Sequence, residues 1–342
     1  MTEAPRRLLV SRTDRLGDVV LTLPLLGLLR ARWPEAEIGV LMRRYARPIA
    51  DACRHVDRVV EWPDHGAATS AERAALLRDT GADTLLHLFP RRDMAAAGRD
   101  AGIPRRIGTA RRWYHWLTCT ERVNVSRKRS ALHEAQLNLL VSAPLLDHST
   151  LTLAELVPHI DLSRTAPLAP RWASRIDAAR CTVLLQPLTG GTVPAWPLEK
   201  WAALADALDP QRFQLFVTGS AAEGTTLREW LGSLPQHAEN ATGQPLADLL
   251  SFTRTSDCFV GASTGPLHIA AALGVPTIGL YPAHESGLPA RWEPLGARTT
   301  MLTPDRAPAA GGRAALDISA IGVDEVRAAV ERAAVERAAR KR

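Results

Sequence analysis

The 342-residue sequence predicts an α/β protein built from two doubly wound halves. Short apolar segments alternate with helical segments through most of the chain, which is typical of parallel βαβ units. Prolines interrupt the chain between about residues 148 and 175, and the alternation then starts again. In the second half an apolar strand runs through a turn of small residues into an alanine-rich helix, over residues 258–273. These three observations together predict two parallel sheets, one in each half.

The first half begins with a buried strand at 7–11 and a helix at 18–32, joined by a polar loop. Further strands are expected at 37–42, 56–62 and 84–88, and helices at 45–52 and 132–140. Residues 100–129 show little periodicity, so we expect loops with short elements there.

The second half repeats the pattern after the proline-containing linker. Strands are expected at 181–187, 212–218, 258–260 and 277–281, and helices at 198–208, 223–231, 246–255 and 266–273. A last helix at 323–340 carries apolar residues on one face, and we expect it to cross back to the first half.

Composition indicates a globular protein: 46% of the residues are hydrophobic and 23% are charged. No apolar run approaches the roughly 20 residues of a membrane span, and the N-terminus lacks the apolar core of a secretory signal. The four cysteines show neither pairing nor metal-ligand spacing, which favours reduced thiols in a cytoplasmic protein.

Positive charge is concentrated in one segment of the first half. Residues 91–129 contain eleven basic and three acidic residues, a net charge of +8, while the whole chain carries +6. Nearly all of this charge is arginine, whose planar fork binds phosphates and carboxylates well. The segment is either a site for an anionic partner or a solvated arginine-rich loop.

The small-residue turn of the second half has the features of a phosphate site. Ser263, Thr264 and Gly265 allow close backbone approach, and the helix that follows presents unpaired N–H groups at its N-terminus. Pro266 fits the first helical turn. A strand–turn–helix crossover without a ligand is the alternative.

Asp18 is the candidate reactive residue of the first half. It stands where the first strand meets the first helix, and open α/β sheets place ligands at this carboxyl edge. An N-cap, whose carboxylate accepts bonds from helix N–H groups, is the alternative role.

Two motifs carry a resemblance to glycosyltransferase family 9, the ADP-heptose:lipopolysaccharide heptosyltransferases. Residues 17–24 (Gly-Asp-Val-Val-Leu-Thr-Leu-Pro) resemble its N-terminal signature, and residues 264–276 resemble its nucleotide-diphosphate loop. The chain departs from the family pattern at Ser263, where many members have aspartate, and at Pro194, where a phosphate-binding lysine is common.

The resemblance implies a GT-B fold, in which two Rossmann-like domains face each other across a cleft. We expect an acceptor-binding domain at 1–165, a nucleotide-sugar-binding domain at 176–322 and the C-terminal helix at 323–342. It implies an inverting glycosyltransferase in which Asp18 is the general base and ADP-heptose is the donor. The acceptor is expected to be an anionic lipopolysaccharide core or related glycan.

Further site residues follow from the same resemblance. The donor set comprises Thr189, Gly190, Gly191, Glu223, Ser263, Thr264, Gly265, Pro266, Leu267 and His268. The acceptor set comprises Gly17, Arg91, Arg92, Arg127, Lys128 and Arg129. Glu223 has a structural alternative as a first-turn glutamate favoured by the helix dipole, and His87, His115 and His133 are interpreted as acceptor-side or structural.

We expect no metal and no cofactor beyond the ADP-sugar, no nucleic-acid partner, and peripheral contact with the inner face of the inner membrane. Two alternatives stay open at this point. One is another GT-B nucleotide-sugar enzyme, with a different sugar or as an epimerase. The other is a non-catalytic binder of an anionic polymer, which the sequence pI of 9.6 allows.

Overall fold

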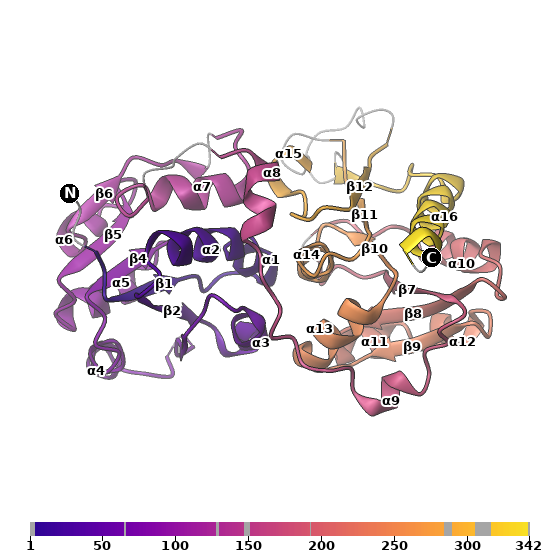
Figure 1. The fold of residues 1–342 in the computed structure, drawn as a ribbon, viewed down its shortest axis with the longest axis horizontal. Helices are drawn as coiled ribbons and strands as arrows, with labels where there is room; N and C mark the ends of the chain where they lie inside the picture. Colours follow the sequence, from indigo (N-terminus) through magenta and orange to yellow (C-terminus); the bar gives the residue numbers. More distant parts are fainter. Residues whose placement is uncertain are drawn as a thin grey trace. The chain divides into compact units, whose positions relative to one another are not determined.

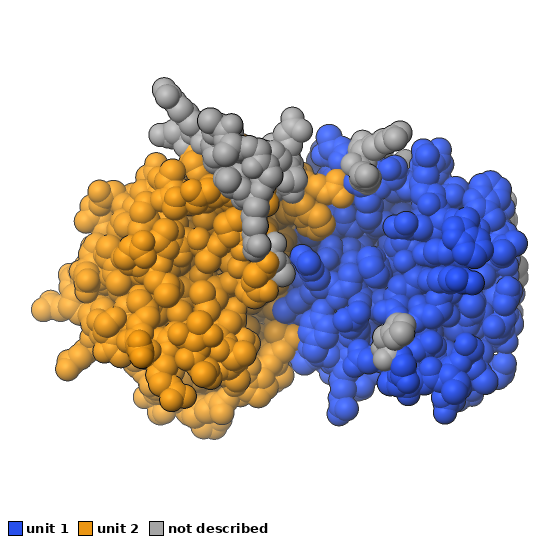
Figure 2. Space-filling view, turned by 180° about the vertical axis from the view of Figure 1, so that it is seen from behind, with its two compact units in different colours: residues 1–164 blue, residues 165–342 orange. Residues whose placement is uncertain are grey.

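The computed structural model confirms the α/β prediction. It describes residues 4–64, 66–127, 130–146, 151–191, 193–283, 289–304 and 316–340. The chain divides into two compact units, residues 1–164 and 165–342 (Figure 1 and Figure 2). Within the described residues, each unit contains one six-stranded parallel sheet flanked by helices.

The first sheet has the strand order β3-β2-β1-β4-β5-β6. Its strands are β1 (Arg7–Ser11), β2 (Glu37–Met42), β3 (Arg58–Glu61), β4 (Thr84–His87), β5 (Arg105–Thr109) and β6 (Glu121–Val123). The helical elements are α1 (Leu16–Val20), α2 (Leu23–Arg32), η1 (Arg44–Ala46), α3 (Arg47–Ala52), α4 (Ser70–Arg78), α5 (Arg92–Asp100), α6 (His115–Thr118), α7 (Glu134–Val141), α8 (Leu153–Leu156) and η3 (Val157–His159).

The second sheet has the order β12-β11-β10-β7-β8-β9, the same connectivity as the first when read from the other edge. Its strands are β7 (Cys181–Gln186), β8 (Phe213–Gly219), β9 (Ala238–Thr242), β10 (Cys258–Ala262), β11 (Thr277–Leu280) and β12 (Thr299–Leu302). The helices are α9 (Pro170–Ala173), α10 (Leu198–Ala207), α11 (Ala221–Thr226), α12 (Arg228–Ser233), α13 (Leu246–Thr255), α14 (Gly265–Ala272), α15 (Pro289–Trp292) and α16 (Val323–Arg340).

This strand order creates one topological switch point in each sheet, where the chain turns from one side of the sheet to the other. In the first sheet β1 pairs with β2 on one side and with β4 on the other, so the switch point lies between β1 and β4. In the second sheet it lies between β7 and β10. The loops that follow these four strands are therefore the expected places for ligands.

Side chains on both faces of each sheet are buried, as expected for parallel strands covered by helices. Leu9, Leu41 and Leu85 pack under α4 and α5 on one face of the first sheet. In the second unit Val183 and Val260 pack under α10 and α16, whereas neighbouring positions on the strands pack under α13 and α14. Alternation along each strand thus supplies two cores per unit.

Several elements differ from those expected from the sequence. The first helix is interrupted at Leu21–Thr22, so two helices replace the expected one. The stretch expected to be loop between residues 100 and 129 contributes strands β5 and β6, and β9 and β12 were also not predicted. All four have polar or charged residues at several positions, because they lie toward the sheet edges, and a polar strand has weak apolar periodicity.

The C-terminal helix does not cross to the first unit as expected. The buried face of α16, formed by Val326, Ala329, Val330 and Ala333, belongs to the core of the second unit. Its apolar stripe is satisfied by α10 and the second sheet, so no driving force remains for a crossing. Among the described residues, no helix combines the length and the apolarity needed to cross a bilayer.

Candidate active site

Asp18 lies in the first turn of α1, in the segment that follows β1 at the first switch point. The N-cap position of α1 is Arg15, whose side chain makes no capping bond, so the N-cap role considered for Asp18 is wrong. Gly17, expected on the acceptor side, precedes Asp18 in the same turn. The Asp18 carboxylate therefore does not cap the helix, and its hydrogen-bond partners lie elsewhere.

One buried guanidinium holds three carboxylates. Arg12 Nη2 donates to Asp18 Oδ1 at 2.7 Å and to Glu134 Oε1 at 3.0 Å, and Nε donates to Asp14 Oδ1 at 2.7 Å. Arg12 Nη1 donates to the amide oxygen of Asn138 at 2.8 Å. The Arg12 side chain is 2% exposed, and that of Glu134 is 1% exposed. We call Arg12, Asp14, Asp18, Glu134 and Asn138 the Arg12 network.

Helix α7 supplies the far side of this network. Glu134 and Asn138 are four residues apart, so they project from the same face of α7. Arg127 binds the same two side chains, with Nε at 2.7 Å from Glu134 Oε1 and Nη2 at 2.9 Å from Asn138 Oδ1. Of the expected acceptor residues, Arg127 thus lies next to Asp18's partners, whereas Lys128 and Arg129 lie outside the described residues.

The environment of Asp18 makes it a stronger base than an ordinary aspartate. Burial raises the pKa of Asp18 to about 6, the charge of Arg12 opposes the rise, and Asp14 and Glu134 add to it. Burial also raises the pKa of Asp14. Burial favours the neutral form of Glu134 too, but the charges of Arg12 and Arg127 prevail and lower its pKa. The ionised form is thus favoured at Glu134 and disfavoured at Asp14 and Asp18.

The geometry leaves one side of the Asp18 carboxylate available. Arg12 occupies Oδ1, and within the described part of the chain no hydrogen bond to Oδ2 is found. The side chain is 13% exposed, so a small group can approach it. A carboxylate with a pKa near 6 and an accessible oxygen is ionised at neutral pH and can accept a proton from a hydroxyl.

The expected phosphate turn lies at the second switch point. Thr264 is the N-cap of α14, yet its side chain makes no capping bond, and Pro266 is in the first turn. Thr264 Oγ1 is buried and has no hydrogen-bond partner among the described residues. The first-turn N–H groups of Gly265 and Leu267 face out of the helix end by helix geometry. An anion here would meet backbone donors and the positive end of the helix.

The other residues of this turn are held by burial or by a hydrogen bond. Leu267 is fully buried in the core beneath α13 and α14, so only its backbone is available to a ligand. His268 is 4% exposed. Ser263 hydrogen-bonds the hydroxyl of Tyr281, whose pKa is raised by burial.

The loop after β7 flanks the same switch point. Gly190 and Gly191 have φ of +60° and +73°, a conformation that other residues rarely adopt, and no atom of the described residues lies near the Cβ position of either. Thr189 Oγ1 donates to the carbonyl of Val193 at 2.5 Å, which closes the loop on itself. Trp196 is 1% exposed and packs in the core, as its interpretation as a packing residue requires.

Glu223 is part of a capping box. Its Oε2 accepts the backbone N–H of Ser220 at 2.7 Å, and its own N–H binds Ser220 Oγ at 3.2 Å. The Ser-x-x-Glu spacing in the sequence is typical of a capping box. The structural alternative for Glu223 is thus present, and a contact with a ribose would compete with one of its carboxylate bonds.

The described arginines of the arginine-rich segment have different surroundings. Arg91 precedes α5 and binds Asp93 with Nε–Oδ1 of 3.0 Å and Nη2–Oδ2 of 2.6 Å. Arg92 is exposed and lies over the ring of Trp113 at 5.1 Å. Both follow β4, across the first switch point from the Asp18 loop. Within this segment, Arg127 reaches the Arg12 network, and Arg91 is neutralised by its neighbour.

The three histidines near the segment have structural surroundings. His87 and His115 are almost completely buried and lie 5.4 Å apart between ring centroids, and burial lowers the pKa of both. His133 Nδ1 accepts the N–H of Ala135 and caps α7. The described residues contain no cluster of His, Cys, Asp and Glu suited to a metal ion. The four cysteines are buried and form no disulfide.

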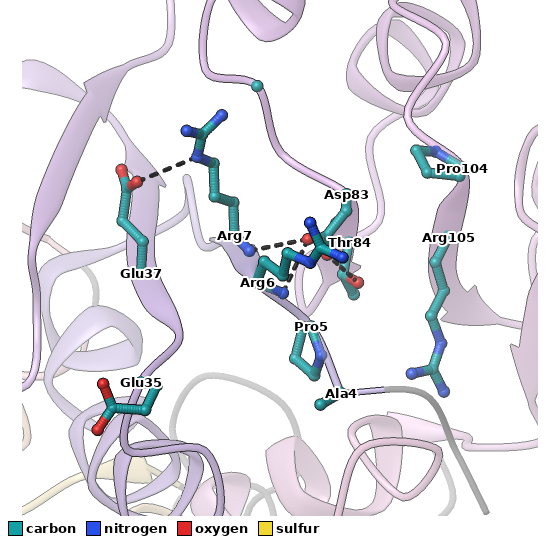
Figure 3. Close-up of a pocket in the computed structure, with 11 residues that line it drawn as sticks. Ala4, Pro5, Arg6, Arg7, Glu35, Glu37, Asp83, Thr84, Pro104 and Arg105 are labelled. Atoms are coloured by element: carbon teal, nitrogen blue, oxygen red, sulfur yellow. Dashed lines mark hydrogen bonds and ion pairs between the residues drawn. The ribbon is translucent and has the colours of Figure 1, made fainter.

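A hollow in the first unit lies at the opposite edge of the sheet (Figure 3). It is lined by residues at the amino ends of the strands, among them Arg7, Glu37 and Asp83. Asp83 accepts the backbone N–H groups of Arg6 and Arg7 at 2.8 and 2.9 Å, and Arg7 pairs with Glu37. These contacts join strand ends, and parallel sheets bind ligands at the other edge, so we assign no site here.

Sequence reasoning did not identify Arg12, Asp14 and Asn138 as site residues, and it gave Glu134 only as part of a segment that resembles the family's acceptor-side helix. Arg12 and Asp14 were seen only as members of a polar loop. A charged cluster immediately after a buried strand is a usable signal, because such residues sit at the ligand edge of the sheet. No local signal links them to α7, since Glu134 is 122 positions from Arg12.

Two Rossmann-type units in one chain, one with a carboxylate at its switch point and the other with a helix N-terminus, define the GT-B class. Residues 77–312 match the family model of glycosyltransferase family 9 (heptosyltransferase), which is more than half of the chain. The chain belongs to glycosyltransferase family 9 and is a glycosyltransferase. The family that the sequence motifs predicted is thereby confirmed, and the interpretation as a non-catalytic binder is excluded.

A curated relative and two solved structures extend this assignment. A putative glycosyltransferase of Haemophilus influenzae is 25% identical over 336 residues, which cover 95% of both chains. The structure of the Escherichia coli ADP-heptose LPS heptosyltransferase II is similar with a TM-score of 0.73 and 21% identity, covering 97% of this chain and 99% of the other. The structure of the E. coli heptosyltransferase WaaC with ADP is similar with a TM-score of 0.69 and 16% identity, covering 96% of this chain and 99% of the other. At these identities the two structures establish the shared fold.

Proposed function

We propose that this glycosyltransferase moves a heptose from ADP-heptose to a hydroxyl of an anionic lipopolysaccharide-core or related glycan, with inversion at the sugar. The observation that carries the proposal is the Asp18 carboxylate, with its pKa near 6, at the carboxyl edge of the first sheet. The family membership and the E. coli structures named for ADP-heptose and for ADP support the choice of donor.

The proposed reaction is a single displacement. Asp18 Oδ2 accepts the proton of the acceptor hydroxyl while the hydroxyl oxygen attacks the anomeric carbon of the donor. The bond from that carbon to the β-phosphate oxygen breaks, and ADP leaves with the electron pair. The N–H groups at the start of α14, and those of the Gly190–Gly191 loop, stabilise the charge that develops on the diphosphate.

On the acceptor side, Arg127 is the arginine that we propose binds a phosphate or carboxylate of the glycan. Its side chain is 24% exposed, and its guanidinium is oriented by Glu134 and Asn138. An anionic group held there would stand close to the partners of Asp18. Donor and acceptor contacts thus come from different units of the chain.

Calorimetry with ADP, UDP and GDP tests the donor assignment, and a transfer assay with ADP-heptose tests the reaction. We expect ADP to bind at least about tenfold more tightly than UDP, which corresponds to about 1.4 kcal/mol. Preferential binding of UDP would point to another nucleotide-sugar enzyme of the same fold. Binding of ADP without transfer of heptose would mean that the donor carries ADP but a sugar other than heptose.

Substitution Gly265→Val tests the phosphate site. A branched side chain at the first helical position would crowd the backbone donors, so we expect ADP affinity to fall at least about tenfold. Gly232→Val is the matched control, because Gly232 lies in helix α12 with no atom near its Cβ position. Unchanged ADP affinity in a folded Gly265→Val protein would remove the diphosphate from this turn.

The pH dependence of transfer follows from the pKa of Asp18. The base must be ionised, so kcat/KM should decrease by about tenfold per pH unit below a limb near pH 6. The negative charge of Glu134 raises the pKa of Asp18, and Glu134→Gln should therefore move this limb to lower pH. Glu336→Gln, at an exposed position of α16, should leave it in place. A limb that does not respond to Glu134→Gln would assign the titration to another group.

A further inference from the structure

The turn around α6 exposes three large apolar side chains together. Trp113, Trp116 and Leu117 are 62%, 60% and 67% exposed. The backbone is helically coiled here, since the N–H of Trp116 bonds to the carbonyl of Trp113 and that of Leu117 to Tyr114. Their spacing of three and four residues puts the side chains on one face. The opposite face, with His115, Thr118 and Cys119, is buried.

Arginines surround these side chains. Arg92, Arg111, Arg112 and Arg122 are exposed, and none forms an ion pair within the described part of the chain. Arg92 lies over Trp113 at 5.1 Å, and Arg122 lies over Trp116 at 4.6 Å. The acidic residues of the neighbourhood are already engaged, because Asp93 binds Arg91 and Glu121 binds Arg105. Positive charge is therefore left unbalanced around an apolar centre.

We propose that this turn, with Trp113, Trp116 and Leu117 at its centre and Arg92, Arg111, Arg112 and Arg122 around them, docks onto an anionic lipid bilayer. Tryptophan prefers the interface between headgroups and acyl chains, leucine enters the acyl region, and arginine binds lipid phosphates. Exposed apolar side chains that are clustered rather than scattered mark an interaction site.

The local geometry favours lipid over a glycan or a second copy of the chain. The surface projects outward on a helical turn, whereas sites for small ligands are concave. One face of each indole is covered by an arginine, which reduces the area available for stacking on a sugar ring. A self-association surface would bring the four unpaired arginines of one copy toward those of the other, which is electrostatically unfavourable.

The position of the turn in the first unit is compatible with a lipid-linked substrate. The turn follows β5, and the indole of Trp116 donates to the carbonyl of Ala110, the first residue after that strand, at 3.0 Å. Helix α6 packs on α5 and β5 near the β6 edge of the sheet (Figure 1). The strands are parallel, so β5 and β1 end at the same edge, and Asp18 follows β1.

Sedimentation of the purified full chain with vesicles tests the proposal, without donor or acceptor. The chain should bind vesicles of equimolar phosphatidylcholine and phosphatidylglycerol, and bind pure phosphatidylcholine much more weakly. The triple variant Trp113→Ser, Trp116→Ser, Leu117→Ser should lose at least about tenfold in partitioning. Arg111→Glu with Arg112→Glu should lose a similar factor on the anionic vesicles, and added salt should weaken wild-type binding.

Val335→Ser is the matched control, because Val335 is an equally exposed apolar side chain (64%) on α16 of the second unit. It should bind vesicles as the wild type does. Failure of the wild type to bind anionic vesicles, or wild-type binding by the triple variant, would overturn the proposal. A change from dimer to monomer in the triple variant, with vesicle binding retained, would instead identify a contact between copies.

The vesicle assay is independent of the proposed function. Calorimetry of ADP with the triple variant should give the wild-type affinity, since the nucleotide is proposed to bind in the second unit. An increase in KM for a delipidated, soluble acceptor, with vesicle binding retained, would assign the surface to the glycan and contradict lipid docking. If the wild type binds vesicles but transfers no heptose from ADP-heptose, the proposed function is overturned and the proposal of lipid docking stands.

Discussion

Replacement of Asp18 by asparagine is expected to reduce the rate of glycosyl transfer by about 10²–10⁴-fold, the range in which a positioned general base contributes. Asparagine keeps the size of the side chain and can still accept a bond from Arg12, but it cannot take a proton from the acceptor. ADP affinity should stay near that of the wild type, because the nucleotide is proposed to bind at α14. Turnover under saturating substrates and calorimetry with ADP measure the two quantities.

The stability of this variant provides an internal check. The pKa of Asp18 is raised to about 6 in the folded protein, above the roughly 3.9 of an unfolded aspartate. The stabilisation that comes from its protonation is fully present below pH 4 or so and is lost as the pH rises through about 6. At neutral pH the wild type therefore bears the cost of a buried charge, and Asp18→Asn should be no less stable. Asp14→Asn is the control for the loss of one carboxylate from the network, since Asp14 binds the same guanidinium.

An Asp18→Asn protein that retains more than about a tenth of wild-type turnover would exclude Asp18 as the base.

Removal of the central cation should have the largest effect on stability. Arg12→Met leaves three carboxylates in a buried site without their shared partner. Breaking a buried ion pair in this way costs about 3–5 kcal/mol, and urea unfolding at neutral pH measures it. Arg127→Met is the matched control: Arg127 binds Glu134 and Asn138 as Arg12 does, but it is more exposed, so its removal should cost less.

The pH dependence of the Arg12→Met variant separates electrostatics from packing. Without the guanidinium, the pKa values of Asp14 and Asp18, which burial already raises, should rise further, and the pKa of Glu134 should rise because only Arg127 is left to lower it. The destabilisation should be small in acid, where the groups are protonated in both states, and should grow as the pH rises through the carboxylate range. A loss of stability that is equal in acid and at neutral pH would show that Arg12 acts through packing alone.

The sequence was sufficient for the strands that are buried on both faces and for the two loops at the switch points. Val183–Leu185 and Val260 are recognisable because parallel core strands form continuous apolar runs. Strands such as β6, with Glu121 and Arg122, are held by backbone pairing at the sheet edge, and their side chains carry no apolar pattern. Such strands are determined by the rest of the sheet and not by their own residues.

The candidate site was predictable only in part. Asp18 could be placed at the ligand edge because its position depends on a local strand–helix junction. The pKa of Asp18 could not be predicted, because it depends on burial first and on the charges of Arg12, Asp14 and Glu134. Glu134 reaches Arg12 only when α7 packs on the first sheet. The arginine-rich segment was counted as one patch, whereas its described arginines include members of ion pairs, a partner of the Arg12 network and the arginines of the exposed turn around α6.

The contact between Arg12 and α7 has a consequence for the chain during its synthesis. A ribosome-bound intermediate that contains Asp18 but lacks α7 has no Glu134 to share the guanidinium, so the burial and the negative charge that raise the pKa of Asp18 are incomplete. The raised pKa of Asp18 is therefore a property of the folded first unit, and it arises only after α7 has been synthesised and packed.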